Sequence, residues 1–175
     1  MLWLADILII TLLLMVFVQD VKSRAVYWIV FPLLVVAFIF WQSIKQRSLT
    51  MPGYDVLFNL GFLMLQLLSL TIGFSFKQKQ WVNITRGFLG WGDILLLVSL
   101  AFFFSFLNFF AFYMGSLLMV LLIWVISRQT LFRNSPHIPL AGLQALLFLM
   151  LFVISLLMPA VDLGSDRWIL HILTL

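Results

Sequence analysis

Long apolar runs, separated by short clusters of charged and turn-forming residues, make up most of the chain. A membrane core about 30 Å thick needs roughly 20 apolar residues per helix, so runs of this kind predict transmembrane helices. One stretch, from Ile94 to Ile126, would be roughly 50 Å long as a single helix, which is too long for one crossing. Ser105 and Asn108 offer a place for the chain to turn back within it. The pattern therefore predicts six spans, at about 3–19, 26–41, 56–76, 92–106, 109–127 and 140–158.

The composition indicates a single transmembrane domain over residues 1–175. Hydrophobic residues make up 65% of the chain and charged residues only 9%, whereas about a quarter of the residues in soluble domains are charged. This excludes an ordinary soluble domain, and the high hydrophobicity excludes a disordered chain. The expected fold class is an all-α integral membrane protein, a bundle of about six transmembrane helices in the lipid bilayer. The remaining segment, 162–175, is amphipathic and is expected to lie at the membrane interface.

Few side chains are available for redox or metal chemistry. The chain has no Cys, which excludes disulfides, Cys-bound zinc and thiol catalysis, and its two His argue against a His-rich metal site. We therefore expect no cofactor and no metal. The net charge of +4 is spread over loops beside the spans, where basic residues usually set the orientation of the protein, so no nucleic-acid partner is expected either.

The basic residues divide unevenly between the two sides of the membrane. Six spans place both termini on one side and the first, third and fifth loops on the other. Those odd loops carry seven basic residues, Lys22, Arg24, Lys77, Lys79, Arg86, Arg128 and Arg133, and the opposite side carries three, Lys45, Arg47 and Arg167. Because cytoplasmic loops are enriched in Lys and Arg, this bias predicts that the odd loops face the cytoplasm and that both termini lie outside.

The acids are six Asp and no Glu, and an acid near the membrane is costly enough to be a candidate functional residue. Four of the six have structural interpretations, at helix ends or in the polar tail: Asp6, Asp55, Asp162 and Asp166. The other two are different. Asp20 ends the first span and Asp93 opens the fourth, so both are expected at the same cytoplasmic edge although they are 73 positions apart.

Two helices can bring Asp20 and Asp93 together at this depth. A close pair of carboxylates cannot easily carry two negative charges, so it holds one proton between its members. One carboxyl can then act as the base on a water molecule while the other protonates a scissile carbonyl oxygen, which is the chemistry of an aspartic protease. The alternative is structural: Asp20 pairs with Lys22 or Arg24, and Asp93 caps its own helix.

Glycines flank the second acid. Gly90 and Gly92 carry no side chains, so backbone or substrate can approach Asp93 closely, although glycine also packs membrane helices together. The roles of the acids can be divided further by the helix dipole, which favours a negative charge at a helix N-terminus and disfavours one at a C-terminus. This predicts Asp93 as the charged base and Asp20 as the protonated acid.

Three segments carry a resemblance to a known family. In Gln19-Asp20-Val21-Lys22-Ser23-Arg24 an Asp is followed by a basic stretch and a second span. Gly90-Trp91-Gly92-Asp93-Ile94-Leu95-Leu96 contains a Gly-x-Gly-Asp motif, and His137-Ile138-Pro139-Leu140-Ala141 places Ile-Pro at the start of the last span. In motif, order and spacing, these segments resemble the type IV prepilin peptidase family of membrane aspartic proteases over nearly the whole chain.

The resemblance implies a peptidase at the cytoplasmic face of a prokaryotic inner (plasma) membrane, with Asp20 and Asp93 as its catalytic residues. Its partners would be prepilin-like substrates, which it cuts before their hydrophobic helix to remove a basic leader. The chain looks like the short members that lack the zinc-binding cysteine loop, so any methylation of the new N-terminus would need another protein. It departs from the family at Val26-Tyr27-Trp28, where Ile-Pro-Asn is frequent, and at Leu95, where Lys is frequent.

A second interpretation is a non-catalytic membrane protein. In a small transporter, or in a subunit of a pilus or secretion assembly, Asp20 and Asp93 would bind a cation or a proton. Transport favours charges near the bilayer midplane at broken helices, whereas both acids are predicted at the membrane edge, which favours proteolysis. Polar residues within the spans, such as Asn59 and Gln144, are expected to face the bundle interior as packing residues.

Overall fold

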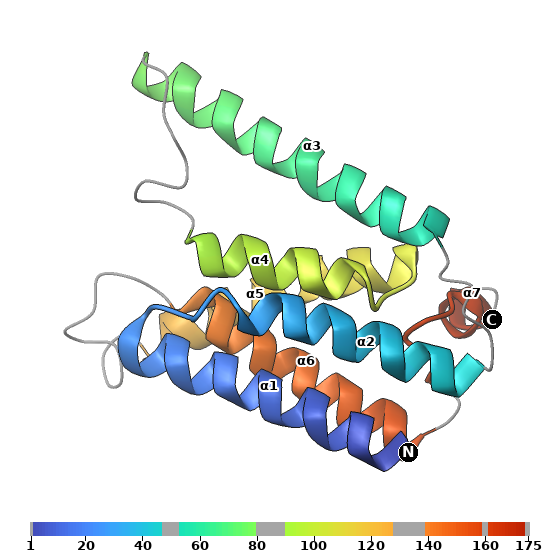
Figure 1. Cartoon of the computed structure of the whole chain (residues 1–175). Helices are drawn as coiled ribbons and strands as arrows, with labels where there is room; N and C mark the ends of the chain where they lie inside the picture. Colours follow the sequence, from blue (N-terminus) through green and yellow to red (C-terminus); the bar gives the residue numbers. More distant parts are fainter. Residues whose placement is uncertain (1, 47–52, 80–89, 128–138, 159–160, 174–175) are drawn as a thin grey trace.

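The computed structural model describes residues 2–46, 53–79, 90–127, 139–158 and 161–173 of the chain. These residues form seven helices, and the expected all-α fold class is confirmed. The helices are α1 (Leu2–Ser23), α2 (Val30–Gln46), α3 (Gly53–Gln78), α4 (Trp91–Ala101), α5 (Phe106–Ser127), α6 (Leu140–Leu157) and α7 (Arg167–Leu173). In Figure 1 the first six lie roughly side by side, while the short α7 lies at the same end as the start of α1.

Four of these helices, α1, α3, α5 and α6, are long and apolar enough to cross a membrane. Together with the composition, they are the helices of an integral membrane protein. The other two predicted spans are shorter, because α2 has 17 residues and α4 only 11. At 1.5 Å per residue α4 is about 16 Å long, roughly half of a 30 Å membrane core. The prediction of a fourth span over 92–106 was therefore wrong at its end: the helix stops at Ala101 and residues 102–105 turn into α5.

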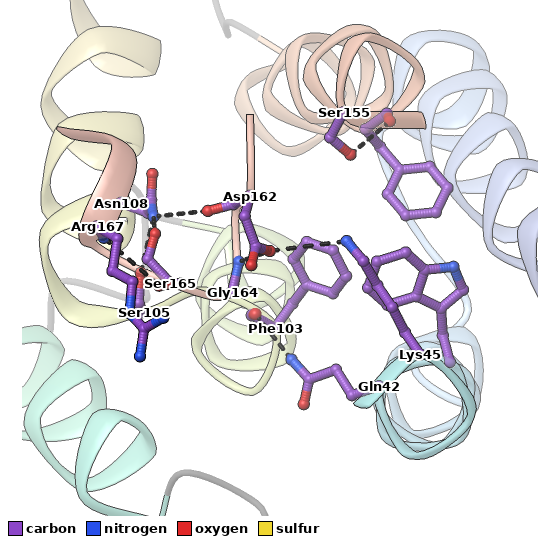
Figure 2. Close-up of polar contacts among 12 residues, drawn as sticks. Gln42, Lys45, Phe103, Ser105, Asn108, Ser155, Asp162, Gly164, Ser165 and Arg167 are labelled. Carbon is purple, nitrogen blue, oxygen red and sulfur yellow. Dashed lines mark hydrogen bonds and ion pairs between the residues drawn. The ribbon is translucent and has the colours of Figure 1, made fainter. Parts of the chain in front are cut away.

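Side-chain amides from two neighbouring helices satisfy the buried C-terminal end of α4. The last carbonyls of a helix have no partner within it, and in lipid each unsatisfied group is costly. Asn59 of α3 donates to the carbonyls of Ala101 at 3.0 Å and Phe104 at 2.9 Å. Gln42 of α2 donates to the carbonyl of Phe103 at 2.9 Å (Figure 2). Asn59 is fully buried, so its predicted inward, structural role is confirmed.

Helix α2 begins at Val30, four residues later than the predicted span. Pro32 lies in its first turn, where the missing backbone N–H would have no helical partner in any case. The preceding residues form turns instead, in which the amide of Val30 donates to the carbonyl of Tyr27 at 3.1 Å. The segment between α1 and α2 is therefore a loop.

Aromatic side chains fill the centre of the bundle. Phe103, in the turn after α4, packs against Phe38 of α2 with ring centroids 4.8 Å apart and against Phe148 of α6 at 5.2 Å. All three rings are almost completely buried. Because lipid tails are as apolar as these rings, close packing rather than exclusion from water holds the membrane helices together here.

The C-terminal tail caps α5 from a distance in sequence. The carboxylate of Asp166 accepts hydrogen bonds from the backbone amides of Leu107 and Asn108 and from the hydroxyl of Ser105. The Asn108 side chain donates to the carbonyl of Ser165 at 3.0 Å, and Figure 2 shows Ser105, Asn108 and Ser165 together. The tail is thus attached to the bundle at the start of α5, which is the turning point expected at Ser105 and Asn108.

We expect Asp166→Ala to lower the free energy of unfolding by about 1–2 kcal/mol, the cost of losing a helix cap. The matched control is Asp162→Ala, because Asp162 caps no helix: its carboxylate accepts from the Gly164 amide at 3.2 Å and forms a half-exposed ion pair with Lys45 at 3.6 Å (Figure 2). Such pairs contribute about 0–1 kcal/mol. Unfolding in detergent micelles measures both variants. An Asp166→Ala protein as stable as Asp162→Ala would contradict the capping role.

Successive helices run in opposite directions, so the loops that carry the basic residues lie at two opposite ends of the bundle. At one end the Trp41 indole near the end of α2 donates to Asp6 near the start of α1 at 2.6 Å. The described cations follow the predicted division: Lys22, Arg24, Lys77 and Lys79 lie at or after the ends of α1 and α3, and Lys45 and Arg167 lie at the opposite end. The remaining basic residues of the prediction, Arg47, Arg86, Arg128 and Arg133, lie outside the described residues.

Candidate functional site

The last turn of α1 carries Asp20. Its side chain is 9% exposed, which is low for an acid one turn from a helix end. The helix ends because Arg24 adopts a left-handed conformation with φ 52°, and the Arg24 amide donates to the carbonyl of Asp20 at 2.9 Å. The Gln19 side chain then accepts from the Tyr27 amide at 3.0 Å, which directs the loop away from the helix end. Asp20 is thereby held inside the bundle.

The first turn of α4 carries Asp93. Gly90 precedes the helix in an extended conformation, and its amide donates to the Asp93 carboxylate at 2.9 Å. This bond closes the first turn of α4 from its own side chain, as an acid three residues into a helix commonly does. The structural interpretation, in which Asp93 caps its own helix, is therefore confirmed for this hydrogen bond.

The start of α6 joins the two acids. The amide of Gly142 donates to the Asp20 carboxylate at 2.6 Å. The Asp93 carboxylate interacts with the neighbouring amide of Ala141 and electrostatically with Asp20. Three helices, α1, α4 and α6, thus bring Asp20 and Asp93 into one site, although the two acids are 73 positions apart in the sequence.

The same helix N-terminus acts on both carboxylates. Free backbone amides and the positive end of the helix dipole stabilise negative charge at this position. The sequence-based division of roles used only the helix to which each acid belongs, and that argument disfavoured a charge on Asp20. Since α6 supplies Asp20 with a direct hydrogen bond, the electrostatic difference between the two acids is smaller than their own helices predict.

At two glycines of the site an added Cβ would be in tight contact with an acid. A Cβ on Gly90 would lie 3.1 Å from Oδ2 of Asp93, and a Cβ on Gly142 would lie 3.1 Å from both Cβ and Oδ2 of Asp20. Gly92 is different, because the nearest atom to a Cβ there would be a Val26 methyl at 3.9 Å, an ordinary contact. Gly92 therefore leaves room beside Asp93 rather than permitting a tight approach.

Asp20 does not pair with its neighbouring cations. Among the described residues, neither Lys22 nor Arg24 forms an ion pair with it, although Arg24 interacts with it at longer range. Its direct partner is the amide of Gly142. Of the third sequence segment, His137 and Ile138 lie outside the described residues, while Pro139 immediately precedes α6 and Ala141 contacts the site.

Gly142 was missed by the sequence analysis, which stopped its third segment at Ala141. Its contribution comes from a backbone amide and from the lack of a Cβ, and neither is visible as a functional side chain. The only signal in the sequence was a glycine three residues after Pro139, in the first turn of a predicted helix. Prolines favour the first turn of helices, so this glycine amide could have been placed at a helix N-terminus.

An apolar groove of about 280 Å³ adjoins the site. It lies between α3, α4 and α5, and two of its lining residues, Ile94 and Leu140, directly follow Asp93 and Pro139 in the sequence. The lining is otherwise apolar except for Gln66 and Tyr113. In Figure 1 α3 diverges from α4 towards the end of the bundle where α4 begins. The groove therefore reaches the first turns of α4 and α6, the two turns that contribute Asp93 and the amides around Asp20.

The described residues contain no cluster of three or more acidic or His side chains that could hold a metal ion. The site consists of two carboxylates and the backbone amides that surround them. No protein family model, curated protein or solved structure matches this chain. The chemistry of the site therefore rests on its own residues and their geometry.

Proposed function

We propose that the protein is an aspartic endopeptidase of the membrane edge, in which Asp20 and Asp93 together activate water. The observation that carries this proposal is that Asp20 of α1 and Asp93 of α4 meet at one end of the bundle, beside the first backbone amides of α6. Two carboxyls near the edge of a membrane protein, held by backbone amides rather than by Lys or Arg, are suited to exchange a proton.

One proton shared by the pair is sufficient for the reaction. The charged carboxylate takes a proton from water, and the resulting hydroxide adds to the scissile carbonyl carbon while the protonated carboxyl donates to its oxygen. Collapse of this tetrahedral intermediate breaks the C–N bond, and the amine leaves with a proton from the pair. Such positioned acid–base catalysis contributes about 10²–10⁴-fold to a rate.

The proposed substrates are prepilin-like proteins, cut before their hydrophobic helix at the cytoplasmic face of a prokaryotic inner membrane. The Gly-x-Gly-Asp motif and the basic residues beside Asp20 support this choice through their resemblance to prepilin peptidases. The apolar groove next to Ile94 also supports it, because a hydrophobic segment lying there would begin beside the acids. A basic excess at this end favours its cytoplasmic orientation.

Co-expression with a prepilin encoded in the same genome tests the proposal. We expect a decrease in prepilin size that corresponds to the leader, and we expect Asp20→Asn and Asp93→Asn to abolish it. Asp6→Asn is the matched control, since an Asn oxygen can still accept the hydrogen bond from the Trp41 indole. Processing by either site variant at the wild-type rate would exclude the proposed pair. Proton or cation uptake into vesicles that depends on both acids, without cleavage, would favour transport instead.

A further inference from the structure

Two polar side chains line the apolar groove that adjoins the paired acids. Gln66 of α3 and Tyr113 of α5 form part of its wall, and the other lining residues are apolar. Phe62, one turn before Gln66 on α3, packs edge-on against the Tyr113 ring with centroids 5.4 Å apart. Gln66 and Tyr113 therefore lie on neighbouring turns of two adjacent helices, and we call them the polar pair.

Neither member of the polar pair has a hydrogen-bond partner within the described part of the chain. Neither is among the polar atoms that the protein encloses without a partner, so the amide and the hydroxyl remain accessible. The other polar side chains of this part of α3 are engaged, since Asn59 donates to α4 and both Ser69 and Thr71 donate to carbonyls of their own helix. Polar groups that face hydrocarbon without a partner are costly, so the polar pair is suited to a ligand that supplies hydrogen bonds.

The chemistry of the polar pair favours a peptide over a lipid. An acyl chain carries no hydrogen-bonding group and would leave the amide and the hydroxyl unsatisfied. A peptide offers one N–H and one C=O per residue, but in a helix these groups are already bonded to each other. The polar pair is therefore complementary to a peptide segment whose backbone is not helical.

Hydrolysis requires such a segment at this place. The scissile carbonyl must be open to water and to a proton donor, whereas a carbonyl inside a helix is bonded to the amide four residues later. The start of the hydrophobic segment must therefore unwind beside the acids, which frees backbone groups that lipid cannot satisfy.

The groove has the position and length for this unwound segment. It begins at Ile94, directly after Asp93, and its wall on α3 runs from Leu63 to Leu70. That wall is about 10 Å long along the helix axis. An extended chain covers this distance in about three residues. The polar pair is thus placed to meet the first few residues after the cut.

We propose that Gln66 and Tyr113 bind the unwound backbone of the substrate directly after the scissile bond, an inference that rests on the proposed protease function. The Gln66 amide can donate to a carbonyl and accept from an N–H, and the Tyr113 hydroxyl can do either. Because the contacts are to backbone groups, they select an extended conformation rather than a particular side chain. The polar pair positions the substrate, while Asp20 and Asp93 perform the chemistry.

The experiment compares the polar pair with identical substitutions elsewhere on α3. Gln66→Leu and Tyr113→Phe remove the polar groups and keep most of the shape. Gln78→Leu and Tyr54→Phe are the matched controls, because both residues are exposed, at the two ends of α3 and outside the groove. The substrate is a synthetic peptide that spans a prepilin cleavage site and its hydrophobic segment, in lipid. We expect each polar-pair variant to lower kcat/KM about five-fold, as the loss of one hydrogen bond does, and neither control to change it.

Contact with the backbone is measured by replacing single peptide amides with esters at the first four residues after the scissile bond. An ester removes the N–H donor and leaves the side chain unchanged. We expect one of these esters to lower kcat/KM of the wild type about five-fold, and to cause no further loss in Gln66→Leu or in Tyr113→Phe. Because neither variant breaks a hydrogen bond within the described residues, thermal unfolding should stay at the wild-type temperature.

The outcomes separate this inference from the proposed reaction. Polar-pair variants as active as their controls, with Asp20→Asn inactive, would overturn the inference and leave the protease function standing. Ester losses that are equal in the wild type and in both polar-pair variants would also overturn it. If the wild type does not cleave the peptide, the Kd of the intact peptide is the readout. A Kd raised about five-fold in each polar-pair variant would then support backbone binding, and an unchanged Kd would overturn it.

Discussion

Asp20→Asn and Asp93→Asn are each expected to reduce the rate of leader removal by at least about 10²-fold, and up to about 10⁴-fold, because each removes one partner of a shared proton. Asn has almost the shape of Asp and can still accept a hydrogen bond from the Gly142 or Gly90 amide. The loss should therefore appear in kcat, with little change in folding or in KM. The measurement is the initial rate of cleavage of a purified prepilin by protein reconstituted in lipid.

The two variants also distinguish the roles of the acids. If Asp93 is the charged base, Asp20→Asn retains more activity than Asp93→Asn; equal losses favour a symmetrical pair, as the shared amides of α6 suggest. Asp6→Asn provides the baseline. Wild-type rates in either site variant, with Asp6→Asn also active, would contradict the proposed reaction.

Gly142→Val should reduce the cleavage rate about 10²-fold, the effect of displacing a catalytic group by roughly 1 Å. Its Cβ alone would lie 3.1 Å from Asp20 Oδ2 and 3.3 Å from the carbonyl oxygen of Phe17, so α1 and α6 must move apart. The amide that holds Asp20 moves with them. Because Gly142 positions Asp20 without touching substrate, kcat should fall while KM stays near its wild-type value.

Gly61→Val controls for the general effect of a β-branched residue in a membrane helix, since its Cβ meets no atom within 4 Å. Thermal unfolding of both variants separates a displaced carboxylate from a partly unfolded bundle. A Gly142→Val protein with wild-type kcat would show that the contact between α6 and Asp20 has no role in positioning.

The apolar runs predicted the helices well because lipid imposes one requirement, a continuous apolar surface, which is readable from composition alone. The turn near Ser105 followed from the maximum length of one span. The placement of Asp20 and Asp93 at the same end of the bundle followed because successive spans cross the membrane in opposite directions. The early end of α4 could not be predicted in this way. It depends on Asn59 and Gln42, whose amides satisfy carbonyls more than 40 residues away in the chain.

The capping of α5 by Asp166 could not be predicted either, because it too joins residues far apart in the sequence. Asp166 lies in a polar tail, where an acid needs no explanation, and its partners Leu107 and Asn108 are nearly 60 positions earlier. Within the site, the two acids were predictable because carboxylates near lipid are costly. The amide of Gly142 was not, since backbone groups leave no trace in a pattern of side chains.

The central claim is that the carboxylates of Asp20 and Asp93 form one site, and the absence of Cys from the chain allows a direct test. The measurement is intramolecular reaction of an Asp20→Cys/Asp93→Cys double variant with a short thiol crosslinker, detected by mass. The control pair is Asp6→Cys/Asp93→Cys, because Asp6 lies about 21 Å from Asp20 along α1. We predict efficient crosslinking of the first pair and none of the second. Failure of the first pair to crosslink, with both of its thiols reactive towards a monofunctional maleimide, would contradict the account.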